Sequence, residues 1–400
     1  MKNKRLIVVT YGFPPIGGAA SERALMLTRY LVQLGWDVTV YCANVDMPHL
    51  FHDEAAVDLI PANVTLHRVQ EPAWYQWVRQ SRILRNSADF TLAHLDPSQP
   101  WTRACQAQIK QNEQPSPQTY LLTTSPPHSI HQIGVNLSKS HQFKWLMDMR
   151  DAWVENTTMR HYSMVHQKLS ERAYAQAVRH ATYIIANTAS MQQLIAVRFP
   201  ESQERITVIP NGYDEALFAD AVPYRPPETV DKLLILYAGG TYGGWVTTIL
   251  QQLLDANTTP DVRVYLVGEL ESSEPYDVNR PIGLGHKSFH QVPAYLLGAD
   301  WLVLCMPQSE AGSARILLKA YGYARAGKPI LYLGPKNATW DYLNERTSVV
   351  QFELSALAEA AQSLANFVSV TNHSLIRQDS FEARAQLIDK LLVEPPKRLS

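Results

Sequence analysis

Runs of apolar residues alternate along this chain with glycine-rich loops and with stretches of helical periodicity. The first run, Leu6 to Val9, is apolar at every position, which is typical of a strand buried on both faces of a parallel sheet. A loop from Gly12 to Gly18 follows, and apolar residues at helical spacing predict a helix from about Ala20 to a stop at Gly35. The next strand is predicted at Val38 to Tyr41. A right-handed β-α-β unit of this kind places the glycine loop at the carboxyl edge of the sheet.

The same pattern recurs along the rest of the chain. In the first half, further strands are predicted at Gln118 to Thr124, Trp145 to Asp148, Tyr183 to Ala186 and residues 206–210. In the second half, strands are predicted at Leu233 to Tyr237, Val262 to Val267, Trp301 to Cys305 and Pro329 to Leu333. Helices are predicted there at Thr247 to Leu254, at about Ala314 to Ala326 and at Phe381 to Leu392. Strands that alternate with helices predict an α/β fold with two doubly wound, Rossmann-like halves.

The length of the chain supports two domains. Its 400 residues exceed what a single hydrophobic core usually holds. A stretch with several prolines and few apolar residues separates the halves and predicts a linker at residues 216–231. The predicted parts are therefore residues 1–215, this linker, residues 232–380 and a C-terminal helix within residues 381–400.

Composition narrows the classes of function. The formal net charge is -1, so no strong positive field favours nucleic acid as a partner. The three cysteines lie far apart and fit neither a metal site nor a disulfide framework, which is typical of a reduced, cytoplasmic protein. No apolar stretch is long enough for a transmembrane helix or for the core of a signal peptide. We expect a cytoplasmic protein, free or bound peripherally at the inner face of the membrane.

Short segments spread over the chain carry a family resemblance. They are Phe13-Pro14-Pro15 with Gly17-Gly18, residues 124–129 (TSPPHS), 148–153 (DMRDAW), 209–214 (IPNGYD), 237–240 (YAGG), and 319–323 (KAYGY) with 327–331 (GKPIL). In this order they resemble the retaining, family 4-like glycosyltransferases that assemble bacterial surface polysaccharides. The resemblance spans the whole chain and implies a GT-B fold, in which two Rossmann-like domains face a central cleft. It also implies an acceptor on residues 1–215, a nucleotide-sugar on residues 232–380, and a final helix that crosses back to the first domain.

The resemblance implies a reaction as well. A sugar is transferred, with retention, from a nucleotide-sugar donor to a glycan or lipid-linked acceptor. The nucleotide-sugar is a substrate, and no cofactor is expected. No aspartate pair stands at metal-binding spacing, and cations with a helix N-terminus can stabilise the leaving group, so we expect no metal.

Two glycine loops are candidate donor sites. Gly17 and Gly18 precede a predicted helix, where free N–H groups and the helix dipole favour a phosphate. The family places this loop against the donor, and the alternative is a tight turn that needs a positive φ. The second glycine-rich loop contributes Gly240 and Thr241.

A basic segment of the second half is the other candidate anion site. Ser313 is a predicted N-cap, and Arg315 and Lys319 stand four residues apart, which places them on one face of a helix. Two cations above a helix N-terminus can neutralise the charge that develops on a leaving nucleoside diphosphate. Lys319 matches a family lysine, whereas Arg315 does not. The alternative is a solvated basic face.

Residues at two predicted strand ends of the first half are the candidate catalytic group. Asp148 and Asp151 can orient a hydroxyl of the acceptor or the sugar, and Arg150 can hold these carboxylates as a bidentate partner. The alternative is an ion-pair network that fixes a loop under Trp153. His128 stands near the place of a family histidine that contacts the transferred sugar, and the alternative is an ordinary loop histidine.

An aromatic and then basic stretch at residues 74–85 is a candidate membrane contact. It comprises Trp74, Tyr75, Trp77, Arg79, Arg82 and Arg85. As a helix it can rest on an anionic membrane surface, where lipid-linked acceptors reside. The alternative is that the aromatic residues pack the helix to the core while the arginines stay solvated.

Three positions depart from the family. Gly322 stands where the family has an acidic residue that binds the donor ribose, and Ala314 stands near the place of its earlier acidic partner. Trp245 replaces a basic residue often found after the second glycine loop. A ribose normally needs a carboxylate acceptor, and Glu269 or Glu310 are the candidates to supply it.

Two rival functions remain open at this stage. The departures at positions 245 and 322 favour a non-catalytic GT-B protein that partners another glycosyltransferase. The other rival is an enzyme of a different kind, either a GT-B sugar epimerase or a dinucleotide-dependent oxidoreductase. The glycine loops form no clean G-x-G-x-x-G, and the second strand ends on no convincing acidic residue, which argues against NAD.

Overall fold

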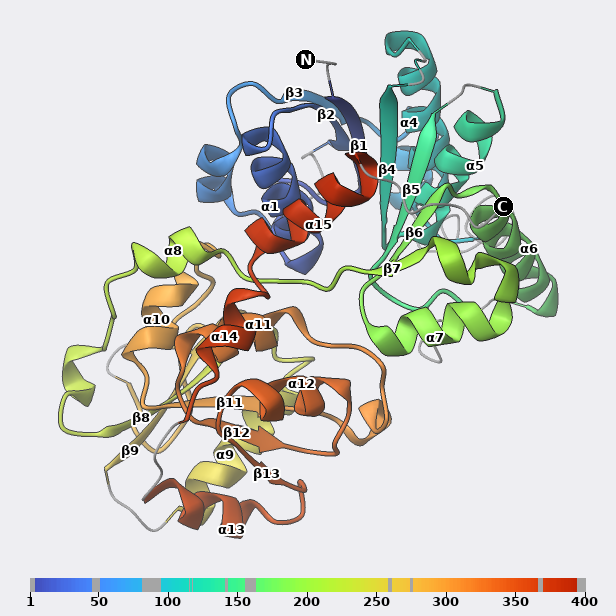
Figure 1. Ribbon diagram of the computed structural model, residues 1–400. Helices are drawn as coiled ribbons and strands as arrows, with labels where there is room; N and C mark the ends of the chain where they lie inside the picture. The colour runs from blue at the N-terminus through green and yellow to red at the C-terminus, as the bar shows by residue number, and fades with distance from the viewer. Residues whose placement is uncertain are drawn as a thin grey trace. The chain divides into compact units, whose positions relative to one another are not determined.

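The computed structural model of this chain (Figure 1) describes residues 4–44, 51–80, 95–114, 116, 118–140, 143–154, 163–257, 261–273, 276–365 and 370–393. The chain divides into two compact units, which are Met1–Pro210 with Arg384–Ser400, and Asn211–Ala383. Each unit is built on a parallel sheet with helices between the strands, which confirms the predicted α/β class.

A seven-stranded parallel sheet forms the centre of the first unit, in the order β3-β2-β1-β4-β5-β6-β7. Its strands are β1 (Lys4–Thr10), β2 (Trp36–Ala43), β3 (Thr65–Val69), β4 (Thr119–Ser125), β5 (Lys144–Met149), β6 (Tyr183–Ala186) and β7 (Ile206–Val208). Its helices are α1 (Ala19–Gln33), α2 (Ala73–Gln80), α4 (Gln99–Asn112), α5 (His131–Ser140), α6 (Met164–His180), α7 (Ala189–Arg198) and most of α15 (Phe381–Val393). The strand order reverses between β1 and β4, as in a doubly wound sheet.

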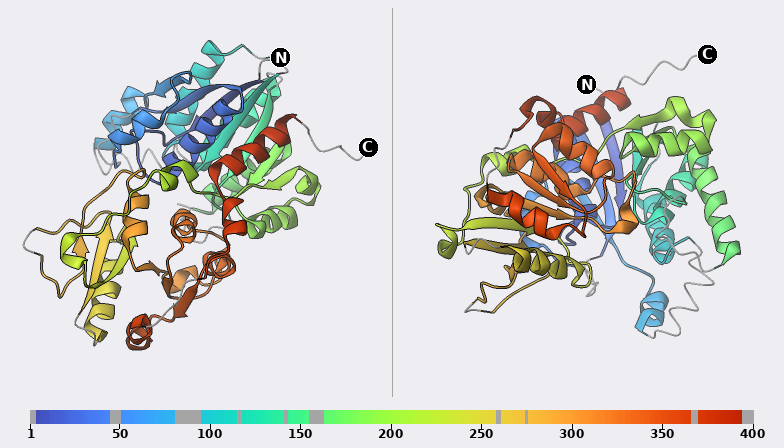
Figure 2. Two further views of the ribbon diagram at one scale, coloured as in Figure 1. Left: turned by 60° about the vertical axis from the view of Figure 1, so that its left-hand side comes forward. Right: turned by 90° about the horizontal axis from the view of Figure 1, so that it is seen from below.

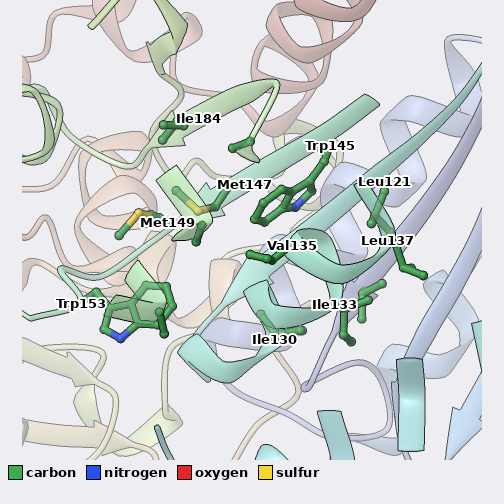
Figure 3. Packing of buried hydrophobic residues seen from close by; sticks show 14 of the residues in the cluster. Leu121, Ile130, Ile133, Val135, Leu137, Trp145, Met147, Met149, Trp153 and Ile184 are labelled. Carbon is green, nitrogen blue, oxygen red and sulfur yellow. The ribbon is translucent and has the colours of Figure 1, made fainter. Parts of the chain in front are cut away.

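Both faces of this sheet are buried. Ile7 and Val9 point to one face, where they join the buried side chains of α4, α5, α6 and α7. Figure 3 shows part of this cluster, with Trp145 and Met147 of β5 beside α5. Val8 points to the opposite face, toward α1. Because successive side chains of a strand alternate between faces, a strand covered on both sides is apolar throughout.

The C-terminal part of α15 packs against the first unit. Asp389 accepts hydrogen bonds from Lys4 Nζ and Trp36 Nε1, both at 2.8 Å. The hydroxyl of Tyr120 donates to the carbonyl oxygen of Leu392 at 2.7 Å. Figure 2 shows this helix, drawn in red, lying against the strands of the first unit. The last described turns of the chain are thus anchored to its first two strands and to β4.

The second unit repeats the architecture with a six-stranded sheet in the order β10-β9-β8-β11-β12-β13. Its strands are β8 (Leu233–Ala238), β9 (Val262–Val267), β10 (Ile282–Gly283), β11 (Trp301–Cys305), β12 (Ile330–Leu333) and β13 (Val349–Phe352). Its helices are α8 (Glu215–Ala219), α9 (Trp245–Ala256), α10 (Val292–Gly298), α11 (Leu318–Ala326), α12 (Ala338–Arg346), α13 (Leu357–Gln362) and α14 (His373–Arg377). Three predicted strands, 183–186, 262–267 and 301–305, have the predicted bounds.

The central strand β8 is also covered on both faces. Leu234 and Leu236 pack with residues of α10, α11 and α12. Ile235 and Tyr237 point the other way and pack with α9 and α13. This alternation directs the side chain of Tyr237 to a definite face at the carboxyl end of the strand.

The segment 216–231 is folded into the second unit, so its prediction as a linker was wrong. It contains the end of α8, and Tyr224 N donates to the carbonyl oxygen of Ala294 in α10 at 2.9 Å. Arg225 forms a bidentate ion pair with Asp300 at 3.0 and 2.9 Å. Its proline content favours extended backbone, but these tertiary contacts hold it on the domain.

Candidate functional site

The carboxyl ends of β8 and β11 meet where the strand order of the second sheet reverses. Ligands of doubly wound sheets bind at such a point, because the connections on its two sides leave in opposite directions. The segments that reach this edge are residues 239–244 after β8, Glu269 after β9, residues 306–317 after β11, and the start of α11. Most of the predicted donor residues lie on them.

The loop after β8 adopts backbone conformations that favour glycine. Gly239 has a φ of 138°, and Gly244, the N-cap of α9, has a φ of 88°. The carboxylate of Glu269 accepts hydrogen bonds from Thr241 N at 2.9 Å and from Thr241 Oγ1 at 2.5 Å. These bonds hold the pKa of Glu269 below its usual value. A Cβ on Gly240 would lie 3.2 Å from Glu269 Oε1, so the structure brings these three predicted residues together.

Lys319 reaches the same loop from the first turn of α11. Its Nζ donates a hydrogen bond to Tyr237 Oη at 2.8 Å and lies 4.1 Å from the centre of that ring. A Cβ on Gly239 would lie only 2.2 Å from Nζ. Burial lowers the pKa of Lys319 to about 8. Within the described parts of the chain this ammonium has no carboxylate partner, so its surroundings favour an anionic ligand.

The predicted placement of Ser313 and Arg315 is wrong. The helix α11 begins at Leu318 rather than near residue 314. Ser313 is therefore not its N-cap, and Arg315 does not share a helical face with Lys319. Ser313 instead closes a turn, in which its Oγ accepts a hydrogen bond from Arg315 N at 3.3 Å.

A threonine of the neighbouring helix bonds to the backbone just before α11. Thr339 Oγ1 accepts a hydrogen bond from Leu317 N at 3.2 Å and donates to the carbonyl oxygen of Arg315 at 3.0 Å. The Leu317 N–H thus bonds to a side chain and not to the carbonyl oxygen four residues earlier, as is usual for the first N–H groups of a helix. The Arg315 guanidinium pairs with Glu310 at 2.7 Å and stays largely exposed. That pair also occupies Glu310, one of the two candidate ribose acceptors.

Packing does not require a glycine at position 322. A Cβ there would lie 3.5 Å from Leu296 and 3.7 Å from Phe218, which are ordinary contact distances. Trp245, the other departure from the family, is the first residue of α9 and packs, partly buried, against the core. Of the two ribose candidates, Glu269 is the exposed one that lies beside the glycine loop.

In the first unit, Gly17 and Gly18 precede α1 as expected, but each has a local structural reason. Gly18 is the N-cap of α1, with a φ of 92°. A Cβ on Gly17 would lie 2.4 Å from the ring of Phe51, whose carbonyl oxygen accepts a hydrogen bond from Gly17 N at 2.8 Å. The alternative of a turn that needs a positive φ is therefore correct for Gly18. The helix N-terminus nevertheless faces this loop.

Asp148 lies at the carboxyl end of β5, but Arg23 rather than Arg150 is its ion-pair partner. Both side chains are fully buried, and Arg23 contacts both carboxylate oxygens, at 3.1 and 2.8 Å. Thr124 Oγ1 donates to the same carboxylate at 2.7 Å. The predicted bidentate pair with Arg150 is wrong, and the alternative of a structural ion pair describes Asp148.

Arg150 is buried as well, and it binds backbone oxygens. Its Nε donates to the carbonyl of Ser125 at 2.7 Å, and its other nitrogens donate to Pro126 and Ala19 at 3.4 and 3.3 Å. Burial lowers the pKa of Arg150 to about 10. Asp151 next to it is half-buried and makes no hydrogen bond or ion pair with any residue that the structure describes. Of the two predicted carboxylates, Asp151 is thus the one without a hydrogen bond or ion pair to a described residue, and its charge acts on the neighbouring Arg150 guanidinium.

His128 lies in the core rather than on the surface of its loop. Only 2% of it is exposed, and its ring stacks on Trp153 with centres 5.0 Å apart. His131, fully buried, lies next to it, and its Nδ1 is 2.8 Å from Thr123 Oγ1. Burial lowers the pKa of His128 to about 3, and it lowers the pKa of His131 well below its usual value. Both rings are therefore neutral at physiological pH.

Because these two histidines are buried and neutral, we expect the protein to lose stability in acid. In the unfolded chain each has a pKa of about 6.5, so below that pH the unfolded state binds more protons than the native state. Stability is complete above about pH 6.5 and falls as the pH drops toward the native pKa values, by about 1.4 kcal/mol per pH unit for each histidine. Urea unfolding followed by tryptophan fluorescence at pH 7.5 and pH 5 measures the difference. A His128→Phe variant is expected to show a smaller loss between these pH values, whereas the exposed His373→Gln control retains all of it.

Two residues of the first unit, Arg23 and His131, lie among the predicted catalytic residues but were not predicted from the sequence. Arg23 stands four residues before Leu27 and eight before Leu31, on the apolar face of α1. A cation at helical spacing with core leucines signals a buried partner, because an unpaired charge there is costly. That signal was available in the sequence, although the identity of the partner was not.

The aromatic stretch falls partly on α2. Trp74 is 49% and Trp77 64% exposed, whereas Tyr75 is fully buried and its hydroxyl donates to the carbonyl of Pro97 at 2.9 Å. The expectation that the aromatic residues pack on the core therefore holds for Tyr75 alone. Arg82, Arg85 and the side chain of Arg79 lie outside the described residues. Within the part that is described, helices long and apolar enough to span a bilayer are absent, and so are groups of three metal-ligating side chains.

Comparisons with known proteins agree with this geometry. The family model described as Glycosyltransferase Family 4 matches residues 16–217. No curated protein matches the sequence. Sucrose-phosphate synthase from Thermosynechococcus elongatus has a similar structure, with a TM-score of 0.65 at 15% identity over 97% of this chain and 98% of that one. WaaG, a glycosyltransferase involved in lipopolysaccharide biosynthesis, is also similar, with a TM-score of 0.57 at 13% identity over 96% of this chain and 94% of that one. HepE from Anabaena in complex with UDP-glucose has a TM-score of 0.59 at 13% identity, also over 96% of this chain and 94% of that one. At such identities the likeness shows the fold, which is GT-B.

Proposed function

This chain belongs to glycosyltransferase family 4, and we propose that it transfers the sugar with retention and without a metal ion to a glycan or lipid-linked acceptor. Family membership makes the chain an enzyme that takes a sugar from a nucleotide-sugar donor. The observation that carries the proposal is the Lys319 ammonium, half-buried beside the glycine loop and held by a phenol instead of a carboxylate.

Lys319 has the chemistry that the leaving group requires. Departure of a nucleoside diphosphate develops negative charge on its phosphate oxygens, and a fixed cation in a partly buried site stabilises that charge. The ammonium lies at the start of α11, whose N-terminal N–H groups add positive potential. In this proposal Gly239, Gly240 and Thr241 line the diphosphate, and Glu269 is available to the ribose hydroxyls.

The first unit contributes the acceptor side of the proposal. Asp151 is the group that contacts a substrate hydroxyl, because its carboxylate is accessible and unpaired within the described residues. Asp148, Arg150 and His128 are buried and hold the strand ends around it. The Gly17-Gly18 turn leads into the N-terminus of α1, whose free N–H groups favour an anion such as a phosphate.

Binding measurements test this function directly. Calorimetry with UDP, UDP-glucose, GDP and ADP identifies the base, and UDP-glucose is the first choice because the similar HepE structure contains it. We expect one nucleoside diphosphate to bind with micromolar affinity without added divalent cation, and to raise the melting temperature. The anomeric configuration of the product, read by NMR, tests retention. If no nucleotide binds, the chain is a partner of another transferase and the proposal fails.

A lipid-linked acceptor brings the enzyme to the inner face of the membrane, and α2 is the proposed contact. Two exposed tryptophans on one short helix match the preference of indole rings for the membrane interface. We expect a Trp74→Ala, Trp77→Ala variant to sediment with anionic phosphatidylglycerol vesicles about ten-fold less than the wild type. Val197→Ser, at an apolar residue 76% exposed on α7, is the matched control and keeps wild-type sedimentation. Equal sedimentation of wild type and tryptophan variant would contradict the contact.

A further inference from the structure

We propose that Tyr237 is a positioning residue for glycosyl transfer, whose phenol oxygen holds the Lys319 ammonium in place for the donor diphosphate and ties it to the glycine loop. This inference rests on the proposed role of Lys319. Tyr237 stands one residue from the end of β8 and is fully buried, so its side chain has a single environment.

The directions of the two hydrogen bonds at Tyr237 are unambiguous. Lys319 Nζ lies 2.8 Å from Tyr237 Oη, and an ammonium can only donate. The phenol then donates its own proton to the carbonyl oxygen of Gly240, also at 2.8 Å. Burial raises the pKa of Tyr237 far above its usual value, so the phenol keeps its proton and remains the donor to Gly240.

The aromatic ring of Tyr237 also interacts with the Lys319 ammonium. Nζ lies 4.1 Å from the ring centre, which is within the range of a cation–π interaction. One side chain therefore supplies both an oxygen acceptor and a negative ring face to Lys319. Neither carries a formal charge, so the ammonium remains uncompensated until an anion arrives. A carboxylate in the same place would compete with the diphosphate for the lysine.

The loop is shaped around this pair. A Cβ on Gly239 would lie 2.2 Å from Nζ and 3.5 Å from Tyr237 Oη, so a side chain at Gly239 would displace the ammonium. Gly240 is held through its carbonyl by Tyr237, and the next residue, Thr241, is held by Glu269. Two consecutive residues of the loop are thus fixed by side chains, one from β8 and one from just after β9, and Tyr237 is the one that also contacts the lysine.

The chain offers a closely matched control in Tyr323 of α11. Tyr323 is equally buried, and its hydroxyl also bridges two backbone groups, accepting from Ala238 N at 2.8 Å and donating to the carbonyl of Val303 at 3.3 Å. It makes no described contact with Lys319. Replacing either tyrosine by phenylalanine removes one buried hydroxyl with two hydrogen bonds, so a general loss of stability affects both variants alike.

Inorganic pyrophosphate is the probe, because it reports the diphosphate site whatever the donor base. We expect Tyr237→Phe to weaken pyrophosphate binding about ten-fold, since a hydrogen bond to a charged group is lost. The pH above which binding is lost is expected to move down, because the phenol oxygen favours the protonated lysine. Tyr323→Phe keeps wild-type affinity and pH profile. Equal affinities and profiles for wild type and Tyr237→Phe, or an equal loss in both variants, would overturn the inference.

A second readout does not depend on donor binding. Reductive ¹³C-methylation of the lysines followed by NMR titration gives the pKa of Lys319 in the ligand-free protein, with Lys319→Met identifying its signal. The signal is expected to titrate at lower pH in Tyr237→Phe than in the wild type. An unchanged titration would overturn the role of Tyr237. Failure of the wild type to bind pyrophosphate, with the titration shifted as expected, would instead remove the proposed function and leave the lysine–phenol pair intact.

Discussion

Replacing Lys319 by methionine is expected to lower kcat/KM for the nucleotide-sugar by about 100- to 1,000-fold, the usual effect of removing one pre-positioned charge partner from a transition state. Methionine fills a similar volume but carries no charge. The loss is expected mainly in kcat, because negative charge on the diphosphate grows as the sugar departs. Steady-state transfer or hydrolysis of the donor selected by calorimetry measures both parameters.

The control for this variant is Lys328→Met, which removes a lysine just after the other end of the same helix. It is expected to stay within about two-fold of wild-type turnover, because a cation at the opposite end of α11 is screened from the diphosphate. Melting temperatures of both variants separate unfolding from loss of function. If folded Lys319→Met retained a tenth or more of wild-type kcat/KM, the lysine would not be the group that stabilises the leaving diphosphate.

Replacing Arg23 by leucine is expected to lower the free energy of unfolding of the first unit by about 3–5 kcal/mol, because it leaves the buried Asp148 carboxylate without its hydrogen-bonded ion-pair partner. Arg23 and Asp148 are both inaccessible to water. The guanidinium also donates to the carbonyl oxygens of Pro210 at 2.7 Å and Ile209 at 3.0 Å. The change therefore also frees the segment that ends the first unit at Pro210.

A double-mutant cycle separates the pair from its parts. Arg23→Leu with Asp148→Leu removes both charges and is expected to recover much of the stability lost by either single change, because neither ion is then left alone in the core. Urea denaturation at pH 7.5 of the wild type, the two single variants and the double variant supplies the four values. Additive losses would show that the two side chains are energetically independent, contrary to the geometry.

Local pattern was enough to predict much of the fold. Strands such as 262–267 and 301–305 are apolar or nearly so along their length because helices cover both faces of each sheet, and such runs bounded by glycine or polar residues are visible in the sequence. The glycine loops before α1 and α9 were predictable for a related reason, since glycine precedes each helix where φ is positive. Both signals depend only on residues near one another in the chain.

The placement of the charged side chains was decided by contacts that no local pattern encodes. Asp148 pairs with Arg23, 125 residues away, and Lys319 meets Tyr237, 82 residues away. The helical pattern around Arg315 was wrong about where α11 begins, and Thr339 of the following helix bonds there to the backbone of Arg315 and Leu317.

The sequence by itself determined the α/β class, most of the strands of both sheets and the position of the glycine loops, because periodicity and glycine report short-range geometry. Only the tertiary structure decided that Asp148 is buried with Arg23, that the ring of His128 stacks on Trp153, and that a phenol holds the lysine. The physical reason is that burial and charge pairing depend on which segments the sheet brings together. A residue's own neighbours in the chain carry little information about that.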